Sequence, residues 1–238
     1  MPTGAVGVGT FGATLMTESP STDHPFEDDD VEFAADDRWL TEKPILDAAL
    51  PADVARLLGR LLNDDPVTTL GAWVTQVRRH TGGGSIAVDD LCHTDVDSPH
   101  RGELDGETYG FRCFYDAVVL AALADKPVDI RTESPGGVAI EAIAAGTDHL
   151  RVAPPDAVFS FGVDEAVEPP EAGAPSNADV YAAVCPYVKA FPDPAAYEAW
   201  AETVEAATVA IPLTGATAIA GALVEPSDRN PTDPNHNA

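Results

Sequence analysis

Residues 110–120, GFRCFYDAVVL, place a cysteine and a carboxylate three positions apart at the start of an apolar run. If this run is helical, Cys113 and Asp116 project from one face, one turn apart. A thiol beside a carboxylic acid can bind a soft metal and move a proton. A structural role fits equally, because cysteine is often buried and an acid in a first helical turn complements the helix dipole. The spacing alone leaves both interpretations open.

Downstream of this stretch, helical and strand patterns intermix. The helix should end near 124–125, and alternating residues on either side of the SPGG turn predict a hairpin over 127–144. Further strands are expected in 149–154 and 157–163, followed by a helix capped by Asp193, a strand and a final helix. Intermixed helices and hairpins indicate an α+β fold with a mixed sheet and flanking helices.

The N-terminal part divides into two segments. Residues 1–41 combine acidic runs with few periodic apolar residues and are expected to form a disordered arm, as is the tail 226–238. Residues 42–84 carry apolar positions at three- and four-residue steps, which predicts a small helical subdomain. The remaining residues, 85–225, are expected to form the catalytic domain.

A polar stretch just before the opening motif carries Cys92, His93 and His100. Mixed cysteine and histidine suggest a metal site, although four ligands at zinc-finger spacing are absent. A loop that folds over a site explains the stretch equally well. Cys92 is a candidate auxiliary thiol that receives or passes on a metal.

The composition is strongly acidic. Of 238 residues, 40 are Asp or Glu and 13 are Lys or Arg, so the formal charge is -27. We interpret this charge as adaptation to molar salt, in which self-repulsion is screened; an acidic surface for partner binding is the competing interpretation. Nucleic acid is disfavoured as a partner, because the only cationic cluster is 78–80 in the helical subdomain.

The three cysteines give no disulfide framework, which suggests a reducing compartment. No apolar run is long enough to span a membrane, and the N-terminus lacks a basic region before its mildly apolar residues. We therefore expect a cytoplasmic protein that does not associate with membranes.

The order of these features resembles the organomercurial (alkylmercury) lyase family. The resemblance runs from Glu103 to about Leu223 and rests on ELDGETYGFRCFYDAVVLAAL, IRTESPGGVAIEAI and VCPYVKAFPDPAAYEAWAETVEAATVAIPLTGA. The family's C-x-x-D pair and downstream cysteine correspond to Cys113, Asp116 and Cys185, with Trp200-Ala201 as a further landmark. A winged-helix-like accessory domain is implied for the N-terminal half, which matches only in being helical.

The resemblance implies an enzyme that cleaves the carbon–mercury bond by protonolysis without an organic cofactor. Two thiolates would hold the mercury of the organomercurial substrate and Asp116 would protonate the leaving carbon. Low-molecular-weight thiols or a mercuric reductase would then remove Hg(II). Cys113 should ionise readily near a helix N-terminus, although the charge of Asp116 opposes this and the two groups should share a proton.

This sequence departs from the family pattern in three places. Arg112 replaces an aromatic residue before the first cysteine, and Ser134 lies near the position of a cysteine that is considered structural. Pro186 directly follows Cys185 and favours extended geometry there. A metal-binding or metal-sensing protein that uses the same three residues without cleavage is the main alternative, and a thiol redox enzyme is disfavoured because no C-x-x-C motif is present.

Overall fold

The computed structural model describes residues 38–41, 43–80, 86–147, 149–170, 173 and 175–225. The predicted arm, up to residue 37, and the predicted tail from residue 226 lie outside the described residues. Within these ranges, no helix is both long and apolar enough to cross a membrane.

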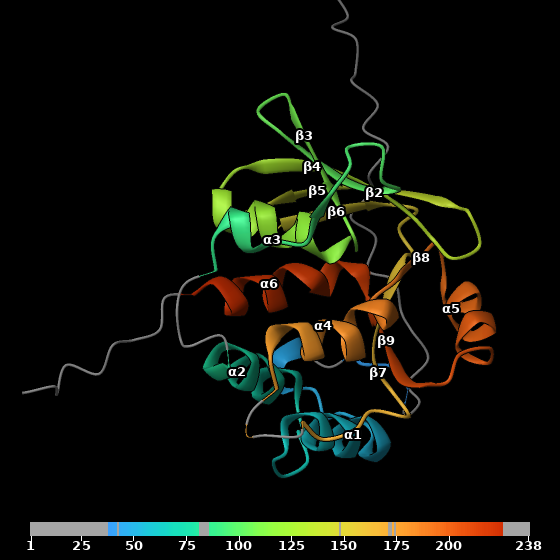
Figure 1. Ribbon diagram of the computed structural model, residues 1–238. Coiled ribbons are helices and arrows are strands. Elements are labelled where there is room, and N and C mark those ends of the chain that lie inside the picture. The colour runs from blue at the N-terminus through green and yellow to red at the C-terminus, as the bar shows by residue number, and fades with distance from the viewer. Residues whose placement is uncertain are drawn as a thin grey trace, which may run out of the picture.

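The described chain forms two antiparallel sheets and a set of short helices, which confirms the α+β prediction (Figure 1). The larger sheet has the order β1-β3-β2-β4-β5-β6 and the smaller β8-β7-β9. The expected mixed sheet was wrong in this respect: among the described residues, the only parallel pairing is an isolated bridge between Trp39 and Ala210. The strands are β1 (His93–Thr94), β2 (His100–Leu104), β3 (Glu107–Phe111), β4 (Pro127–Glu133), β5 (Ala139–Ala145), β6 (His149–Ala153), β7 (Val158–Asp164), β8 (Ala190–Phe191) and β9 (Ala206–Pro212).

Side-chain caps fix the starts of several helices. The Thr69 hydroxyl accepts the Ala72 N–H, and the Asp193 carboxylate accepts the Ala196 N–H, as its predicted capping role requires. The helices are α1 (Ala52–Leu62), α2 (Leu70–His80), α3 (Tyr115–Ala124), α4 (Asn177–Val184), α5 (Pro194–Ala201) and α6 (Ala216–Val224), with 3-10 turns at Ile45–Asp47, Val88–Asp90, Cys185–Tyr187 and Leu213–Gly215.

Two hairpins build most of the larger sheet. The predicted β4–β5 hairpin is present, and its strands alternate buried and exposed residues. A second hairpin, β2–β3, occupies a stretch that we expected to be loop. Its turn residues, Asp105 and Gly106, both have positive φ, as a two-residue hairpin turn requires. This hairpin leads the chain directly into the Cys113 segment.

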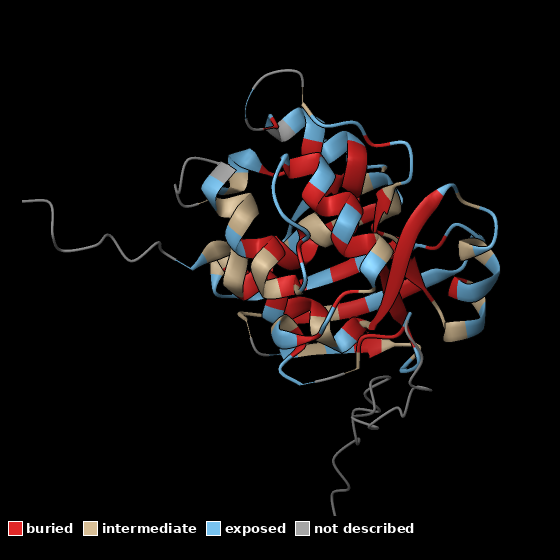
Figure 2. Ribbon diagram, turned by 90° about the horizontal axis from the view of Figure 1, so that it is seen from below, coloured by how far each residue is buried: buried red, intermediate tan, exposed pale blue. Residues whose placement is uncertain are grey.

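The helices stack in layers below the larger sheet (Figure 1). Helix α3 packs between that sheet and α6, and α6 in turn contacts α2. The mostly apolar helix α3 is therefore covered on several sides, and Ala117, Leu120 and Ala121 are fully buried. Figure 2 shows the buried residues concentrated in these central helices and strands.

The helical segment shares its core with the rest of the chain. Helix α1 packs against β7 and β9, and its buried leucines belong to the same hydrophobic cluster as α3. Upstream, Trp39 and Leu40 are buried against β9, so the end of the predicted arm docks on the fold. The division into 42–84 and 85–225 stays a prediction.

Candidate active site

The Cys113–Asp116 pair lies where strand β3 passes into helix α3. Phe111 ends the strand and Phe114 precedes the helix, and both side chains are buried, which anchors the connection between them. Cys113 lies in this connection, two residues before the helix, whereas Asp116 lies in its first turn. The Cys113 thiol donates to the Asp116 carboxylate across 3.6 Å. The three-residue spacing therefore brings the two groups together, although Cys113 is not itself helical.

Cys185 lies at the C-terminus of α4, which begins with a capping box at Ser176. Its backbone is in the right-handed helical region (φ -58°, ψ -33°), so the expected extended geometry before Pro186 was wrong. The cause is local: Cys185 ends α4 and opens a 3-10 turn, and its carbonyl accepts the Val188 N–H. This turn directs the Cys185 side chain into the same cavity as Cys113 and Asp116.

The three side chains line a cavity of about 350 Å³. Its wall is mainly aliphatic and aromatic and is contributed by α2, α3, α4, α6, β7 and the segment before β1. Besides the three chemical groups, the lining residues are Leu70, Trp73, Val77, Ile86, Asp90, Leu91, Tyr115, Val119, Phe159, Phe161, Val180, Tyr181, Val184, Val188, Ile219 and Leu223.

The two thiols differ in their environment. The interaction with the Cys185 thiol, followed by burial, raises the pKa of Cys113 well above its ordinary value. The same interaction with Cys113 lowers the pKa of Cys185, and the positive charge of Lys189 lowers it further, against the opposing effects of burial and Asp116. Cys185 is therefore the more acidic thiol, and the expectation that Cys113 would ionise readily was wrong. Burial and the thiol partner outweigh the nearby helix N-terminus.

Asp116 is a carboxyl group with a pKa near neutrality. Burial raises the pKa of Asp116 to about 6, although hydrogen bonds from Cys113 and from the Cys92 backbone N–H lower it. A carboxyl group in this range can both accept and release a proton near neutral pH. It lies next to the thiol that keeps its proton.

Cys92 lies beside the cavity without lining it. Its carbonyl accepts the Arg112 N–H, and its own N–H donates to Asp116, so its backbone ties the preceding segment to the site. Burial raises the pKa of the Cys92 thiol to about 11, and the negative charges of Asp116 and Cys185 add to this shift. The backbone of Cys92 therefore supports the site through these two hydrogen bonds, whereas its thiol stays outside the cavity.

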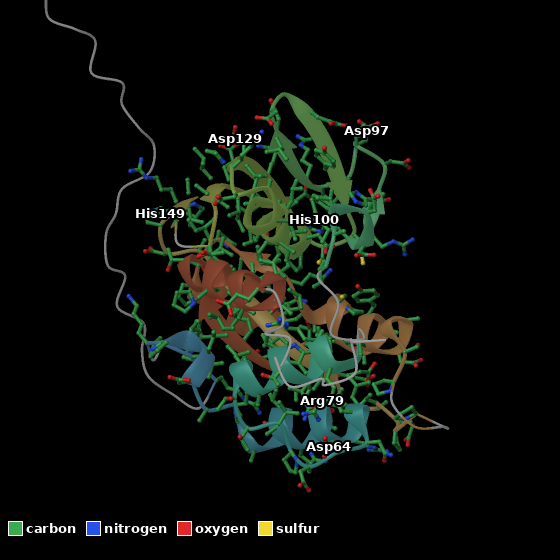
Figure 3. All side chains as sticks on the ribbon, turned by 90° about the vertical axis from the view of Figure 1, so that its left-hand side faces the viewer. Asp64, Arg79, Asp97, His100, Asp129 and His149 are labelled. Carbon is green, nitrogen blue, oxygen red and sulfur yellow. The ribbon has the colours of Figure 1, made fainter. Side chains whose placement is uncertain are left out.

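The two histidines of the polar stretch have separate partners. The His93 ring contacts the Val88 carbonyl, and buried His100 hydrogen-bonds Thr132 across 2.6 Å. Figure 3 shows His100 deeper in the molecule than Asp97 and Asp129, which lie toward the sheet end, whereas Arg79 lies toward the opposite, helical end. Within the part of the chain that the structure describes, no three His, Cys, Asp or Glu side chains are grouped to hold a metal ion. Because the two histidine rings have separate partners, the structure favours the loop interpretation of this stretch over a shared Cys–His metal site.

Several residues around the site were not predicted from the sequence. The positive charge of Lys189 lowers the pKa of Cys185. Tyr115 lines the cavity, and its hydroxyl donates to the Ala216 carbonyl. The rarity of lysine in this chain, and the position of Lys189 four residues after Cys185, could have indicated it. Trp73 gave no such signal, because its contact with the site depends on tertiary packing.

Comparison with known proteins identifies the family of the chain. The family model for alkylmercury lyase (MerB) matches residues 93–225, more than half of the chain. The chain belongs to the alkylmercury lyase family. It is therefore an organomercurial lyase. The family match favours this enzyme over the alternative of a metal-sensing protein on the same scaffold. No curated protein matches the chain.

Several solved structures are similar to this alkylmercury lyase. One of them is titled "Crystal structure of the mercury-bound form of MerB2", with 18% sequence identity and a TM-score of 0.41. The match covers 73% of this chain and 91% of that one.

Proposed function

We propose that this lyase cleaves the carbon–mercury bond with Cys185, Cys113 and Asp116. One observation carries the assignment: a single apolar cavity is lined by two thiols and a carboxyl group, and the carboxylate accepts a hydrogen bond from the Cys113 sulfur across 3.6 Å. Soft thiolates bind mercury and a carboxylic acid supplies the proton, so the cavity combines both requirements of protonolysis. Its apolar wall suits the organic group of the substrate.

Capture of the substrate begins at Cys185. Its thiolate attacks the mercury of R–Hg–X and displaces the ligand X, forming a sulfur–mercury bond. The Cys113 thiol then passes its proton to the Asp116 carboxylate, and the resulting thiolate becomes the second sulfur ligand of the mercury. The proton that leaves Cys113 is therefore stored on Asp116.

Cleavage uses this stored proton. The Asp116 carboxylic acid protonates the carbon, which keeps the electron pair of the carbon–mercury bond and leaves as R–H. Hg(II) stays on the two sulfurs as the bound product, and Asp116 returns to the carboxylate. The step requires no organic cofactor. Exogenous low-molecular-weight thiols, or the thiols of a mercuric reductase, exchange with the protein sulfurs and remove the metal.

The experiment is incubation with phenylmercuric acetate in high salt with excess thiol, and measurement of benzene by gas chromatography. We expect benzene from the wild type and none from Cys113→Ser, Cys185→Ser or Asp116→Ala. Full turnover by Cys185→Ser would contradict the two-thiolate scheme.

Cys92 is proposed only as an auxiliary acceptor of Hg(II). Its half-buried position beside the site supports the proposal, whereas its raised pKa makes the thiol a weak nucleophile at neutral pH. The Cys92→Ser variant keeps the backbone N–H that binds Asp116, so it should turn over normally. Slower transfer of Hg(II) to an external thiol would support the role, and an unchanged transfer rate would remove it.

We also propose a cytoplasmic, salt-adapted setting for the enzyme. Both catalytic thiols and Cys92 are free in the structure, and the chemistry depends on their reduced state. The formal charge of -27 supports operation in concentrated salt, in which acidic side chains repel one another less.

A further inference from the structure

The cavity beside the two cysteines has one wall that lies outside the family match. Three residues of α2, namely Leu70, Trp73 and Val77, line the cavity, but the alkylmercury lyase model matches only residues 93–225. The catalytic groups therefore lie within the matched residues, whereas the α2 wall of the cavity lies outside them. A feature outside the shared segment can differ in shape without changing the chemistry.

Trp73 is the largest side chain of this wall, and its position is fixed. It is 7% exposed, and its indole ring packs against Phe161 of β7 with ring centroids 5.8 Å apart. Helix α2 is tied to the end of α6, because Arg78 donates to the Ala222 carbonyl across 3.2 Å and also to the Glu225 carbonyl. Trp73 is thus a rigid boundary rather than a mobile cover.

The cavity is large for a methyl group. Its volume of about 350 Å³ compares with ~30 Å³ for a water molecule, which is similar in size to methyl. It lies at the lower end of the range for small organic ligands, roughly 300–1,000 Å³. The rings of Tyr115, Phe159 and Phe161 line it together with Trp73. These rings offer edge and face contacts to an aromatic group and little to a methyl group.

We propose that Trp73 is a specificity-determining residue, which makes the lyase favour organomercurials with a single aromatic ring over methylmercury and over larger ring systems. The proposal rests on the proposed function of the cysteine and aspartate site. Trp73 acts on the organic group alone, because the groups that bind mercury and carry the proton come from the connection before α3, the first turn of α3 and the end of α4. Its replacement should therefore change selectivity between substrates that share the same mercury chemistry.

The test measures kcat and KM for methyl-, phenyl- and 1-naphthylmercury, with the released hydrocarbon quantified by gas chromatography. The wild type should prefer phenyl to methyl and to naphthyl. In Trp73→Ala, kcat/KM for phenylmercury should fall about tenfold, mainly through KM, and that for methylmercury should change less than about twofold. The naphthyl-to-phenyl ratio of kcat/KM should rise about tenfold.

Two further variants keep this test decisive. Trp73→Phe retains an aromatic wall and should shift the ratios in the same direction by a smaller factor. Leu58→Ala, in α1, removes a fully buried side chain that does not line the cavity, so it controls for lost stability. Leu58→Ala should change kcat/KM by the same factor for all three substrates.

Equal scaling of the three substrates by Trp73→Ala and Trp73→Phe would overturn the specificity role. Wild-type protein that releases no hydrocarbon from any of the three substrates would instead contradict the proposed function, and the inference with it.

Discussion

At the scale of single residues, two identical thiols acquire different chemistry from their positions. Cys113 is buried and its pKa is raised, whereas the interaction with Cys113 and the positive charge of Lys189 lower the pKa of Cys185. The sequence predicts the Cys113–Asp116 contact, because residues three apart near a helix start share a face. It does not predict which thiol ionises, because that depends on burial and on a partner about 70 residues away.

This difference predicts an order of alkylation. In protein treated with limiting iodoacetamide near neutral pH, Cys185 should be modified first, because the thiolate is the reactive form and Cys185 is the more acidic and more exposed thiol. Peptide-mapped mass spectrometry gives the order, and Cys92→Ser removes the third thiol as a competitor. Faster labelling of Cys113 than of Cys185 would contradict the assignment of Cys185 as the capturing thiolate.

Asp116→Asn should separate activity from stability. Turnover should fall at least about 100-fold, because the amide cannot carry the proton. Burial raises the pKa of Asp116 to about 6 from an ordinary 3.8, so the folded state binds more protons than the unfolded state between these values. The charged carboxylate therefore costs stability as pH rises through 6, and the variant should be more stable at pH 7.5 by about 1–3 kcal/mol.

Urea unfolding at two pH values checks this prediction. The gain should vanish near pH 4, where the carboxyl group of the folded wild type is protonated. Wild-type kcat/KM should fall as pH decreases below about 6, because a protonated Asp116 cannot accept the Cys113 proton. A variant that is less stable than the wild type at pH 7.5 would contradict a destabilising carboxylate.

At the scale of elements, the site depends on the hairpin that precedes it. The β2–β3 hairpin was missed because its strands are polar and exposed on one side and show little of the apolar alternation that revealed β4–β5. The Asp105-Gly106 dipeptide was the available signal, since both residues adopt the positive φ of a tight hairpin turn. Turn chemistry is the better guide where a strand carries few apolar residues.

Gly110, in β3, should be sensitive to any side chain. A Cβ at this position would lie 2.0 Å from the Asp95 carbonyl oxygen, so the neighbouring backbone would have to move. Gly110→Ala should lower the free energy of unfolding by about 3 kcal/mol. It should also reduce kcat/KM about 100-fold, because it displaces the segment that holds Cys113.

Gly136→Ala is the matched control for this change. It lies in the β4–β5 turn, where a Cβ would meet nothing closer than the Ser134 hydroxyl at 3.8 Å. Its stability should stay within about 0.5 kcal/mol of wild type. Comparable losses in the two variants, by thermal unfolding and benzene release, would argue against a specific steric role for Gly110.

At the scale of the whole molecule, charge is the dominant global feature. The ion pairs Arg38–Asp53, Arg60–Glu168, Lys126–Asp105 and Arg131–Glu141 are all substantially solvent-exposed. Such pairs contribute about 0–1 kcal/mol each, which is little against the self-repulsion of a chain with a formal charge of -27. Dissolved salt is therefore expected to supply the screening that the protein lacks.

Thermal unfolding in low and high salt tests this expectation. Tm should rise by about 10 °C between roughly 0.1 M and 3 M KCl, which corresponds to roughly 3–5 kcal/mol for a domain of this size. Sucrose, which stabilises proteins without screening charge, is the control. A Tm that does not depend on KCl, or that responds equally to sucrose, would contradict salt adaptation.

The assembled cavity is the property that the sequence predicts least. It joins α2, the start of α3 and the end of α4, which are far apart along the chain. Local patterns predict each helix, but the approach of Trp73 to the cysteine site depends on the packing of α2 on α6. The chemistry could be predicted from a short motif, and the shape around it could not.

The unequal burial of the two sulfurs gives product release a direction. Cys113 is 7% exposed, whereas Cys185 is partly accessible. In the proposed mechanism, an incoming thiolate therefore reaches the mercury from the Cys185 side and replaces that outer ligand first. The Cys113–mercury bond would break only when a second incoming thiolate binds. Hg(II) would therefore keep at least one sulfur ligand throughout its release. In this mechanism, the asymmetry proposed to order substrate capture also keeps Hg(II) bound to sulfur during its transfer.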